Sequence, residues 1–275
     1  MDSLSTIDTW SAEHAAVAVV DADGTVLGTY GPLDHRFALA SVTKPLVAYA
    51  VLIAVEEGAV ELDDPAGPPG ATVRHLLAHT SGLAFDDRQT VAAPGTRRVY
   101  SSAGFEVLAD TVQAATGIAF PQYLKEAVFE PLKMTSAELV GPAGSGAEAS
   151  CADLIRFAVE LQAPTLVAPE TLAAATSVVF PNLDGVLPGF GNQRPNDWGL
   201  GFEIRSRKCP HWTGDRNSPA TFGHFGAAGT FAWVDPAARV ATIALTDRPF
   251  EQWATEVWPP FNDAVLAEVS ALRGQ

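Results

Sequence analysis

Ten consecutive apolar residues, Leu46 to Val55, constrain this chain more than any other segment. Pro45 stands just before them, and because proline lacks a backbone N–H it fits a helix only in the first turn. We therefore expect a helix that begins close to Ser41 and ends near Gly58, a residue type typical of the position after a helix C-terminus. A helix that is apolar on every face is buried on all sides. The sequence thus predicts a helix in the middle of a domain.

Size and composition indicate an ordinary globular protein. The 275 residues, 47% of them apolar, suffice for one large domain or two interleaved lobes. The net charge of −15 repels nucleic acid and anionic membranes, so we expect neither as a partner. Cys151 and Cys209 form no C-x-x-C pair and are expected to be free thiols. The start of the chain has no leader pattern and no apolar run reaches about 20 residues, so we expect a cytoplasmic protein.

Strand patterns lie near both ends of the chain, and helical patterns lie between them. Apolar runs around DADG and DPAA predict two hairpins, and WGLGFEIR predicts a further strand. The expected helices cover, approximately, residues 72–80, 103–115, 120–129, 152–161 and 253–272. Residues 141–150 are rich in Gly, Ala and Ser and suggest a linker, whereas residues 180–197 suggest a long functional loop such as a lid.

These patterns predict an α+β fold, with one antiparallel sheet built from both chain ends, flanked by helices, and a helical lobe inserted between them. The expected boundaries assign residues 1–60 and 195–275 to the sheet lobe and residues 61–194 to the helical lobe, within one domain overall.

Ser41 and Lys44 are the first candidates for chemistry. A serine hydroxyl needs a base to act as a nucleophile, and residues at i and i+3 share a helical face. Burial and the positive end of a helix both favour the neutral amine, which can then serve as that base. The free N–H of Ser41 in the first turn can bind an oxyanion. A capping serine with a solvated lysine has the same spacing, and a residue before proline disfavours α geometry at Lys44.

Two further residues are candidates on weaker local grounds. Tyr100 follows a loop and precedes a helix, where its phenol can face a cleft or pack in the core. His224 opens a glycine-rich strand, which allows close approach of a ligand or another backbone. A hydrogen-bonded core histidine is the alternative for His224.

In this order, the segments S41-V-T-K44, Y100-S-S102 and H224-F-G226 resemble the three active-site elements of the β-lactamase and penicillin-binding-protein superfamily. The closest variant is the branch of class C β-lactamases and family VIII esterases. The resemblance extends over about residues 15 to 250 and includes LLAHTSGL, PG, GFEVLADTVQAATG and YLKEAVFEPLKM.

The resemblance implies a set of roles. Ser41 would be acylated, while Lys44 and Tyr100 would share proton transfer, with Tyr100 as a phenolate-like base. His224 would lie near Tyr100 in place of the usual lysine. The backbone N–H groups of Ser41 and Ala227 would form the oxyanion hole. The reaction would be acyl transfer to water, with no metal and no cofactor.

Departures from the family pattern concern the expected substrate-binding residues Ser102, Phe225 and Gly226. Ser102 replaces the usual asparagine, and Phe225 replaces a small or hydroxylated residue. His224 is less positive than lysine near neutral pH. These changes weaken recognition of an anionic lactam or D-Ala-D-Ala terminus. We therefore expect a carboxylesterase acting on a small-molecule ester or amide, with weak β-lactam hydrolysis.

Two alternatives remain open. A D-alanyl-D-alanine carboxypeptidase or a true β-lactamase would need a cation for the substrate carboxylate, which Arg194, Arg205 or Lys208 would supply. A catalytically idle homologue would bind a ligand in the same cleft. The sequence does not specify an oligomeric state.

Other motifs are absent or fit structural roles. His75 and His79 have the spacing of a helical zinc pair, but position 76 is Leu rather than Glu, so we expect a structural helix. Ser81 lacks an adjacent base and is expected to be a turn residue. The chain has no G-x-S-x-G elbow, P-loop or dinucleotide fingerprint.

Overall fold

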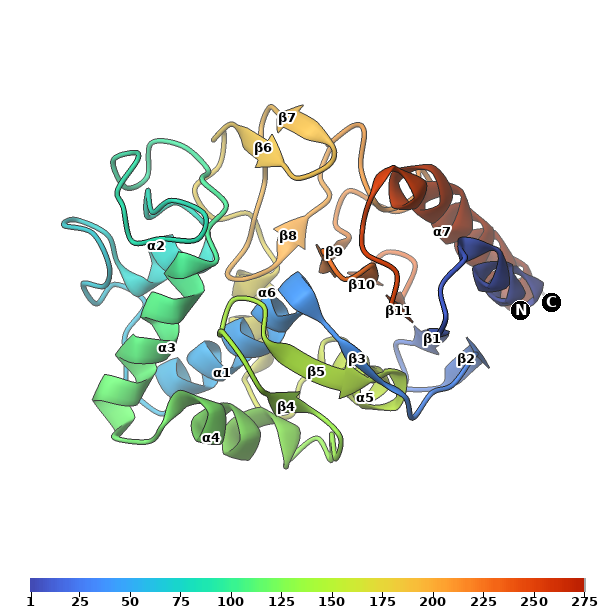
Figure 1. Ribbon diagram of the computed structural model, residues 1–275, viewed down its shortest axis with the longest axis horizontal. Coiled ribbons are helices and arrows are strands. Elements are labelled where there is room, and N and C mark those ends of the chain that lie inside the picture. The colour runs from blue at the N-terminus through green and yellow to red at the C-terminus, as the bar shows by residue number, and fades with distance from the viewer. Residues whose placement is uncertain (275) are drawn as a thin grey trace.

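The computed structural model, which describes residues 1–274, contains a six-stranded antiparallel sheet of order β2-β1-β11-β10-β9-β8 (Figure 1). The first and last strands of the chain pair directly, from Ala15 with Thr246 to Asp21 with Val240. This pairing confirms the α+β class and the sheet built from both chain ends. The strands are β1 (Ala15–Asp21), β2 (Val26–Tyr30), β8 (Glu203–Ile204), β9 (Phe222–Gly226), β10 (Thr230–Asp235) and β11 (Val240–Thr246).

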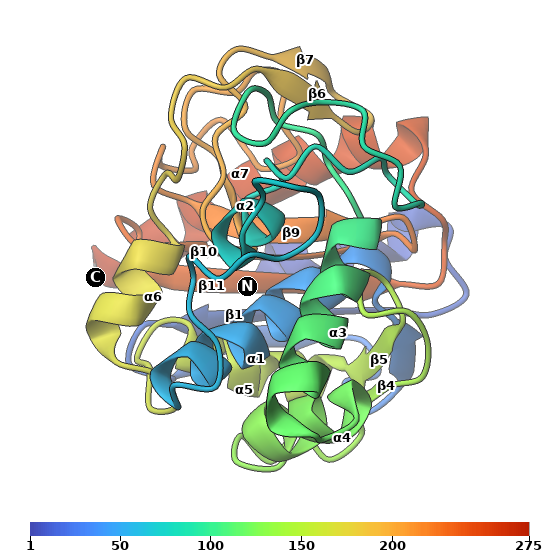
Figure 2. The same ribbon diagram turned by 90° about the vertical axis from the view of Figure 1, so that its left-hand side faces the viewer.

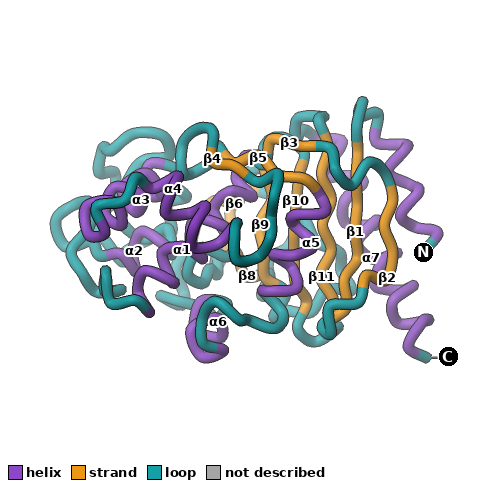
Figure 3. Tube along the Cα trace, turned by 90° about the horizontal axis from the view of Figure 1, so that it is seen from below, coloured by secondary structure: helices purple, strands orange, loops and turns teal. Residues whose placement is uncertain are grey.

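Helices cover both faces of this sheet. The helix α5 (Cys151–Glu160) crosses one face, and α7 (Gln252–Arg273) lies on the other beside the 3₁₀ helix η1 (Asp2–Trp10) (Figure 3). Alternate residues of β1 therefore enter two different cores, with Val17 and Val19 facing the α7 side. The sequence pattern did not predict η1.

The buried helix α1 (Thr43–Glu56) lies among the other helices and also contacts β9 (Figure 2). Every residue from Thr43 to Ala54 is buried, and Gly58 follows the helix at φ 73°, as predicted. A 3₁₀ turn, η2 (Ala40–Val42), leads into it. The remaining helices are α2 (Val73–Leu77), α3 (Ala103–Thr116), α4 (Phe120–Leu124) with the π-helical turn η3 (Lys125–Phe129), and α6 (Pro169–Ala175), which was not predicted.

The linker expected at residues 141–150 is wrong. Its last residues form β5 (Ala147–Ser150), the middle strand of a three-stranded sheet with β3 (Arg36–Ala38) and β4 (Glu138–Leu139). Small residues give no apolar alternation, so the pattern did not reveal this strand, which pairs with the nearby β4 and with β3 far away in the sequence. Because β3 ends just before η2, this small sheet supports the turn that carries Ser41.

The long loop expected at residues 180–197 instead contains a hairpin, β6 (Gly185–Leu187) and β7 (Gly191–Gln193) (Figure 1). The guanidinium of Arg98 is buried and donates to the carbonyls of Val179, Phe180 and Asn196, and so holds both ends of the segment. The strand expected in 198–205 is reduced to the two residues of β8.

Within residues 1–274, no helix has both the length and the apolar character needed to cross a membrane. Cys151 is buried, Cys209 is exposed, and neither forms a disulfide.

Candidate active site

Ser41 lies in a turn that the main sheet holds from one side. The preceding residue, Ala40, has a left-handed backbone with φ 46°, which is uncommon outside glycine. The Thr230 hydroxyl donates to the Leu39 carbonyl at 2.9 Å. A Cβ on Gly226 would lie 2.4 Å from that same carbonyl oxygen. The end of β9 can therefore reach the turn only because position 226 has no side chain.

Lys44 lies fully buried beside Ser41. Its Nζ is 3.2 Å from the Ser41 hydroxyl, 3.0 Å from the Ser102 hydroxyl and 2.8 Å from the Gly144 carbonyl. Burial lowers the pKa of Lys44 to about 7. A neutral amine can donate to Gly144 and Ser102 while its lone pair accepts from the Ser41 hydroxyl. Lys44 is helical despite the following proline, since these contacts and its burial fix its position.

Two members of the site escaped sequence reasoning because they lie away from any motif. The Gly144 backbone accepts from Lys44 and donates its own N–H to Glu106 Oε1 at 2.9 Å. The negative charge of Glu106 raises the pKa of Lys44 and so opposes part of the effect of burial. Gly144 belongs to the expected linker, and nothing in its local sequence indicates this contact.

The structure brings Tyr100 and His224 together across 124 positions of the chain, with 3.3 Å between the phenol oxygen and Nε2. Nδ1 of His224 lies 2.6 Å from the Phe225 carbonyl, which can only accept, so Nδ1 carries a proton. Burial lowers the pKa of His224 to about 3, and the ring is neutral at pH 7. Nε2 is therefore an acceptor for the Tyr100 hydroxyl.

Tyr100 itself is protonated in this arrangement. Burial raises its pKa above the ordinary value, and a hydrogen bond with Ser41 only partly opposes that rise. The resting phenolate that the resemblance implied is not favoured, because His224 is neutral and burial outweighs the effect of Lys44, whose Nζ lies 4.7 Å from the centre of the Tyr100 ring. The neutral form of Lys44 is the stronger candidate for the base.

Two cavities meet at Ser41 and Ala227. We call the first, of about 120 Å³, the apolar cavity, and the second, of about 500 Å³, the acidic cavity. The apolar cavity is lined by Ser41, Phe85, Tyr100, Leu187, Pro188, Trp198, Glu203, His224, Phe225, Ala227 and Phe250. The acidic cavity is lined by Ala40, Ser41, Phe85, Asp86, Asp87, Arg88, Ser102, Ala103, Glu106, Pro142, Ser145 and Ala227.

The expected substrate-binding residues divide between these surroundings. Ser102 lines the acidic cavity while bonding to Lys44. Phe225 lines the apolar cavity, where its ring lies 4.9 Å from that of Phe250. Gly226 lines neither cavity; its place against Leu39 makes it a support for the Ser41 turn. Ala227 borders both cavities beside Ser41, as an oxyanion site formed by their two N–H groups requires.

The three expected carboxylate-binding cations do not line either cavity. Lys208 is buried and bonded to Glu203 and the Asp197 carbonyl. Arg205 donates to the Thr213 hydroxyl and neighbouring carbonyls. Arg194 is exposed and lies 3.5 Å from an Asp184 oxygen. Among the residues that the structure describes, no lysine or arginine lines the apolar cavity.

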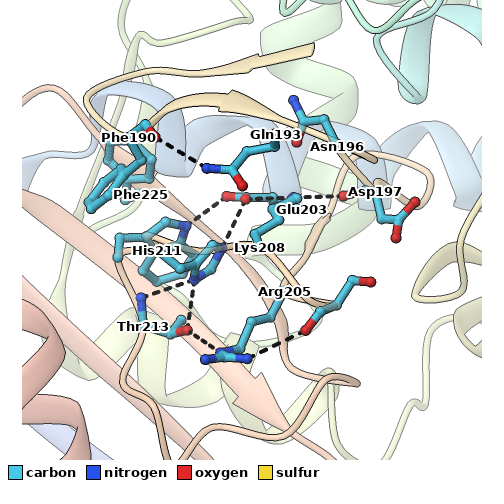
Figure 4. Close-up of polar contacts among 12 residues, drawn as sticks. Phe190, Gln193, Asn196, Asp197, Glu203, Arg205, Lys208, His211, Thr213 and Phe225 are labelled. Carbon is cyan, nitrogen blue, oxygen red and sulfur yellow. Dashed lines mark hydrogen bonds and ion pairs between the residues drawn. The ribbon is translucent and has the colours of Figure 1, made fainter. Parts of the chain in front are cut away.

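Glu203 is a buried carboxylate on the wall of the apolar cavity that sequence reasoning missed (Figure 4). It accepts from Lys208 Nζ at 2.7 Å, His211 Nε2 at 3.0 Å and Trp212 Nε1 at 2.7 Å. Burial alone raises the pKa of Glu203, but Lys208 and His211 more than offset it and the pKa lies below its ordinary value. Glu203 is therefore ionised and paired with Lys208.

The other sequence candidates do not line the cavities at Ser41. The helix α2 ends at Leu77, so His75 and His79 are not an i, i+4 helical pair. Ser81 accepts from the Leu83 N–H within its turn, as expected for a turn residue.

One group of possible metal ligands occurs in residues 1–274. Glu13, His14 and Asp247 have ligand atoms within 4.8 Å of one another. The Asp247 carboxylate already accepts from the backbone N–H groups of Glu13 and His14 and from His14 Nδ1. None of these residues lines the cavities at Ser41.

The antiparallel sheet, the inserted helices and the adjacent Ser41, Lys44 and Tyr100 define the fold class shared by β-lactamases and transpeptidases. A family model described as Beta-lactamase matches residues 9–266. The chain belongs to the β-lactamase family.

Relatives and solved structures agree with this assignment. A β-lactamase from Mycobacterium bovis is 58% identical, with a TM-score of 0.96 over 97% of this chain and 99% of the other. Simvastatin synthase from Aspergillus terreus is 18% identical and shares the fold, with a TM-score of 0.81 over 98% of this chain and 93% of the other. Esterase EstB from Burkholderia gladioli is 26% identical over 85% of this chain and 83% of its own length.

Some relatives are longer than this chain. A penicillin-binding protein of Bacillus subtilis is 27% identical over 56% of this chain. The D-alanyl-D-alanine-carboxypeptidase/endopeptidase AmpH of Escherichia coli is 26% identical over 45%. The matches span only 41% and 44% of the lengths of these two relatives.

Proposed function

We propose that this protein is a serine hydrolase that forms an acyl-enzyme on Ser41 and acts on small, uncharged esters. The observation that carries the proposal is the 3.2 Å contact between the Ser41 hydroxyl and a buried lysine whose pKa is about 7. Such a lysine is neutral in a large fraction of molecules at physiological pH and can remove the serine proton.

The reaction proceeds by acyl transfer. Neutral Lys44 takes the Ser41 proton while Oγ attacks the ester carbonyl carbon, and the N–H groups of Ser41 and Ala227 hold the oxyanion. The bond to the leaving oxygen then breaks, and that oxygen takes a proton from Tyr100, which the Lys44 ammonium replaces. In deacylation, water gives a proton to Tyr100, whose own proton passes to Lys44, and attacks the acyl carbon. The bond between the acyl carbon and Ser41 Oγ then breaks, Oγ takes the proton back from Lys44, and the acid leaves.

The neutral His224 orients this proton transfer. Because its Nδ1 is committed to the Phe225 carbonyl, Nε2 accepts from Tyr100 and directs the phenol. His224 thereby holds Tyr100 in position without adding a positive charge to the site.

The substrate class follows from the two cavities. The apolar cavity is small and mostly aromatic or aliphatic, so it suits a short uncharged acyl group. Glu203 on its wall neutralises the charge of Lys208, and no cation lines the cavity within residues 1–274, so a carboxylate finds no positive partner there. The acidic cavity is larger and suits a neutral alcohol portion rather than an anionic one. The likeness to esterase EstB over most of both chains supports this class.

β-Lactam hydrolysis is the second candidate, because the 58% identical Mycobacterium bovis relative is named a β-lactamase. The sequestered positions of Lys208 and Arg205 count against efficient binding of an anionic lactam or a D-Ala-D-Ala terminus. A catalytically idle homologue would have no need of the contacts among Ser41, Lys44 and Tyr100.

Intact-mass spectrometry tests the proposal. The protein is incubated with p-nitrophenyl butyrate, a chromogenic cephalosporin and a fluorophosphonate, with Ser41→Ala as the control. We expect a covalent adduct with the fluorophosphonate and turnover of the ester, both lost in Ser41→Ala. Adducts that persist in Ser41→Ala, or a wild-type protein that neither reacts with the fluorophosphonate nor turns over either substrate, would rule the proposal out.

A further inference from the structure

A buried histidine that the proposed chemistry does not use, His79, lies beside Tyr100. The two ring centroids are 4.6 Å apart, and His79 is 1% exposed. Its backbone has φ 55°, a left-handed conformation that a histidine rarely adopts. A strained and buried polar residue next to a reacting group suggests a role there.

His79 binds the backbone on both sides of Tyr100. Its carbonyl accepts from the Val99 N–H at 2.9 Å. Its ring atom Nδ1 accepts from the Ser101 N–H at 3.1 Å. The residues before and after Tyr100 are thus attached to a single residue, and the Tyr100 ring packs on the ring of that residue.

Neighbouring bonds extend this attachment. Arg98 Nη1 donates to the Ala78 carbonyl at 2.6 Å, and the Gly95 N–H donates to the Thr80 carbonyl at 2.8 Å. Residues 78–80 are therefore hydrogen-bonded along residues 95–101, and the His79 ring packs against the Tyr100 ring.

The hydrogen-bond pattern fixes the tautomer of His79. Because Nδ1 accepts a backbone N–H, the proton of the neutral ring is on Nε2. Nε2 is buried and has no hydrogen-bond partner among residues 1–274. Burial, with the nearby charge of Lys44, holds the pKa of His79 well below its ordinary value. The ring remains a neutral acceptor and is not available to act as a base.

We propose that His79 is a positioning residue for the reaction, holding Tyr100 at the distance from Ser41 and His224 that proton transfer requires. This inference rests on the role proposed for Tyr100. Of the two hydrogen bonds of His79, mutation can remove only the one between Nδ1 and the Ser101 N–H, since the carbonyl that binds Val99 belongs to the backbone. A displacement of about 1 Å at a reacting group can cost roughly 10²-fold in rate.

The test compares two substitutions that differ in the acceptor. In His79→Asn, the side-chain oxygen can replace Nδ1, and asparagine tolerates positive φ. In His79→Leu the volume is kept and the acceptor is lost. We expect His79→Leu to lower kcat about 10²-fold with KM nearly unchanged. We expect His79→Asn to recover most of that loss.

His75→Asn is the matched control, since the His75 ring bonds to Thr72 and stacks on Phe180 rather than on Tyr100. It should leave kcat unchanged. Melting temperatures identify any loss due to unfolding. Equal damage in His79→Asn and His79→Leu, or a folded His79→Leu with wild-type kcat, overturns the proposal.

A measurement on the wild-type protein remains decisive if His79→Leu does not fold. The ¹⁵N shifts of the His79 ring should show protonated Nε2 and unprotonated Nδ1 from pH 5 to 9, without titration. A proton on Nδ1, or titration in that range, overturns the proposal. This readout needs no turnover, so it distinguishes failure of the His79 inference from failure of the proposed hydrolase activity.

Discussion

The phenol of Tyr100 is hydrogen-bonded to a histidine, His224, that is held as a neutral acceptor, with 3.3 Å between the phenol oxygen and Nε2. The other ring nitrogen is bound to the Phe225 carbonyl at 2.6 Å. A lysine at this place would add a positive charge and favour a phenolate. The neutral ring instead leaves Tyr100 protonated and assigns the role of base to Lys44.

Removal of the Lys44 amine should abolish most activity. Lys44→Ala is expected to lower kcat/KM for p-nitrophenyl butyrate by about 10³-fold while the protein stays folded, because the base for Ser41 is lost. Lys125→Ala is the control, since Lys125 is exposed and outside both cavities. Activity within a few-fold of wild type in Lys44→Ala would disprove the assignment of Lys44 as base.

The pH dependence should reflect Lys44. Only the neutral amine accepts the serine proton, and its pKa is about 7. The rate of Ser41 acylation should therefore rise about tenfold per pH unit below 7 and level off above it. Stopped-flow measurements of the acylation rate from pH 5 to 9, with the background rate of Ser41→Ala subtracted, would show this rise. A rate that is flat below pH 7, or still rising steeply above pH 8, contradicts the expectation.

Glu203 should determine which charge on the acyl group the enzyme prefers. In Glu203→Gln the positive charge of Lys208 is no longer neutralised, so preference for p-nitrophenyl butyrate over mono-p-nitrophenyl glutarate should fall about tenfold, or 1.4 kcal/mol. The variant should also be less stable, because Lys208 stays buried without its partner. Assays are therefore made well below its melting temperature.

The double variant Glu203→Gln/Lys208→Met is the matched control for the Glu203 prediction. It removes both charges, so its preference for the neutral ester should return toward that of wild type. An unchanged preference in the single variant would show that Glu203 does not set specificity.

Phe225→Thr should shift the balance toward β-lactams. The substitution enlarges the apolar cavity and supplies a hydroxyl, so cephalosporin acylation should rise relative to ester hydrolysis. Loss of the buried ring should cost about 3 kcal/mol in the free energy of unfolding. The ratio of the two rates, measured on the folded variant, is the test, and a ratio equal to that of wild type argues against this role.

Gly226→Ala should damage the turn that carries Ser41. Its Cβ would lie 2.4 Å from the Leu39 carbonyl oxygen, so the end of β9 must move. We expect a loss of about 2 kcal/mol in the free energy of unfolding and slower fluorophosphonate labelling.

Gly104→Ala is the control for the Gly226 prediction. Gly104 is helical, and its added Cβ meets other atoms no closer than 3.6 Å. This variant should be as stable as wild type or more stable by up to about 1 kcal/mol. Equal effects of the two substitutions on stability would contradict the close approach at Gly226.

Much of the fold could be predicted because its signals are local. The hairpins near each end follow from apolar runs beside turn residues, and α1 follows from Pro45 and its apolar body. The pairing of Ser41 with Lys44 follows from their spacing on one helical face. The predictions failed where local signals are weak, at the small-residue strand β5 and at the β6–β7 hairpin within a loop-like segment.

By itself, the sequence determined the buried helix α1, the two hairpins and the adjacency of Ser41 and Lys44, because each depends on residues a few positions apart. Tertiary structure alone decided that Gly144 accepts from Lys44, that Glu203 is paired with Lys208 on a cavity wall, and that His79 supports Tyr100. These contacts depend on how strands and turns from distant parts of the chain are brought together. The spacing of residues along the sequence does not give the distance between such side chains in the folded protein, nor the burial that sets each pKa.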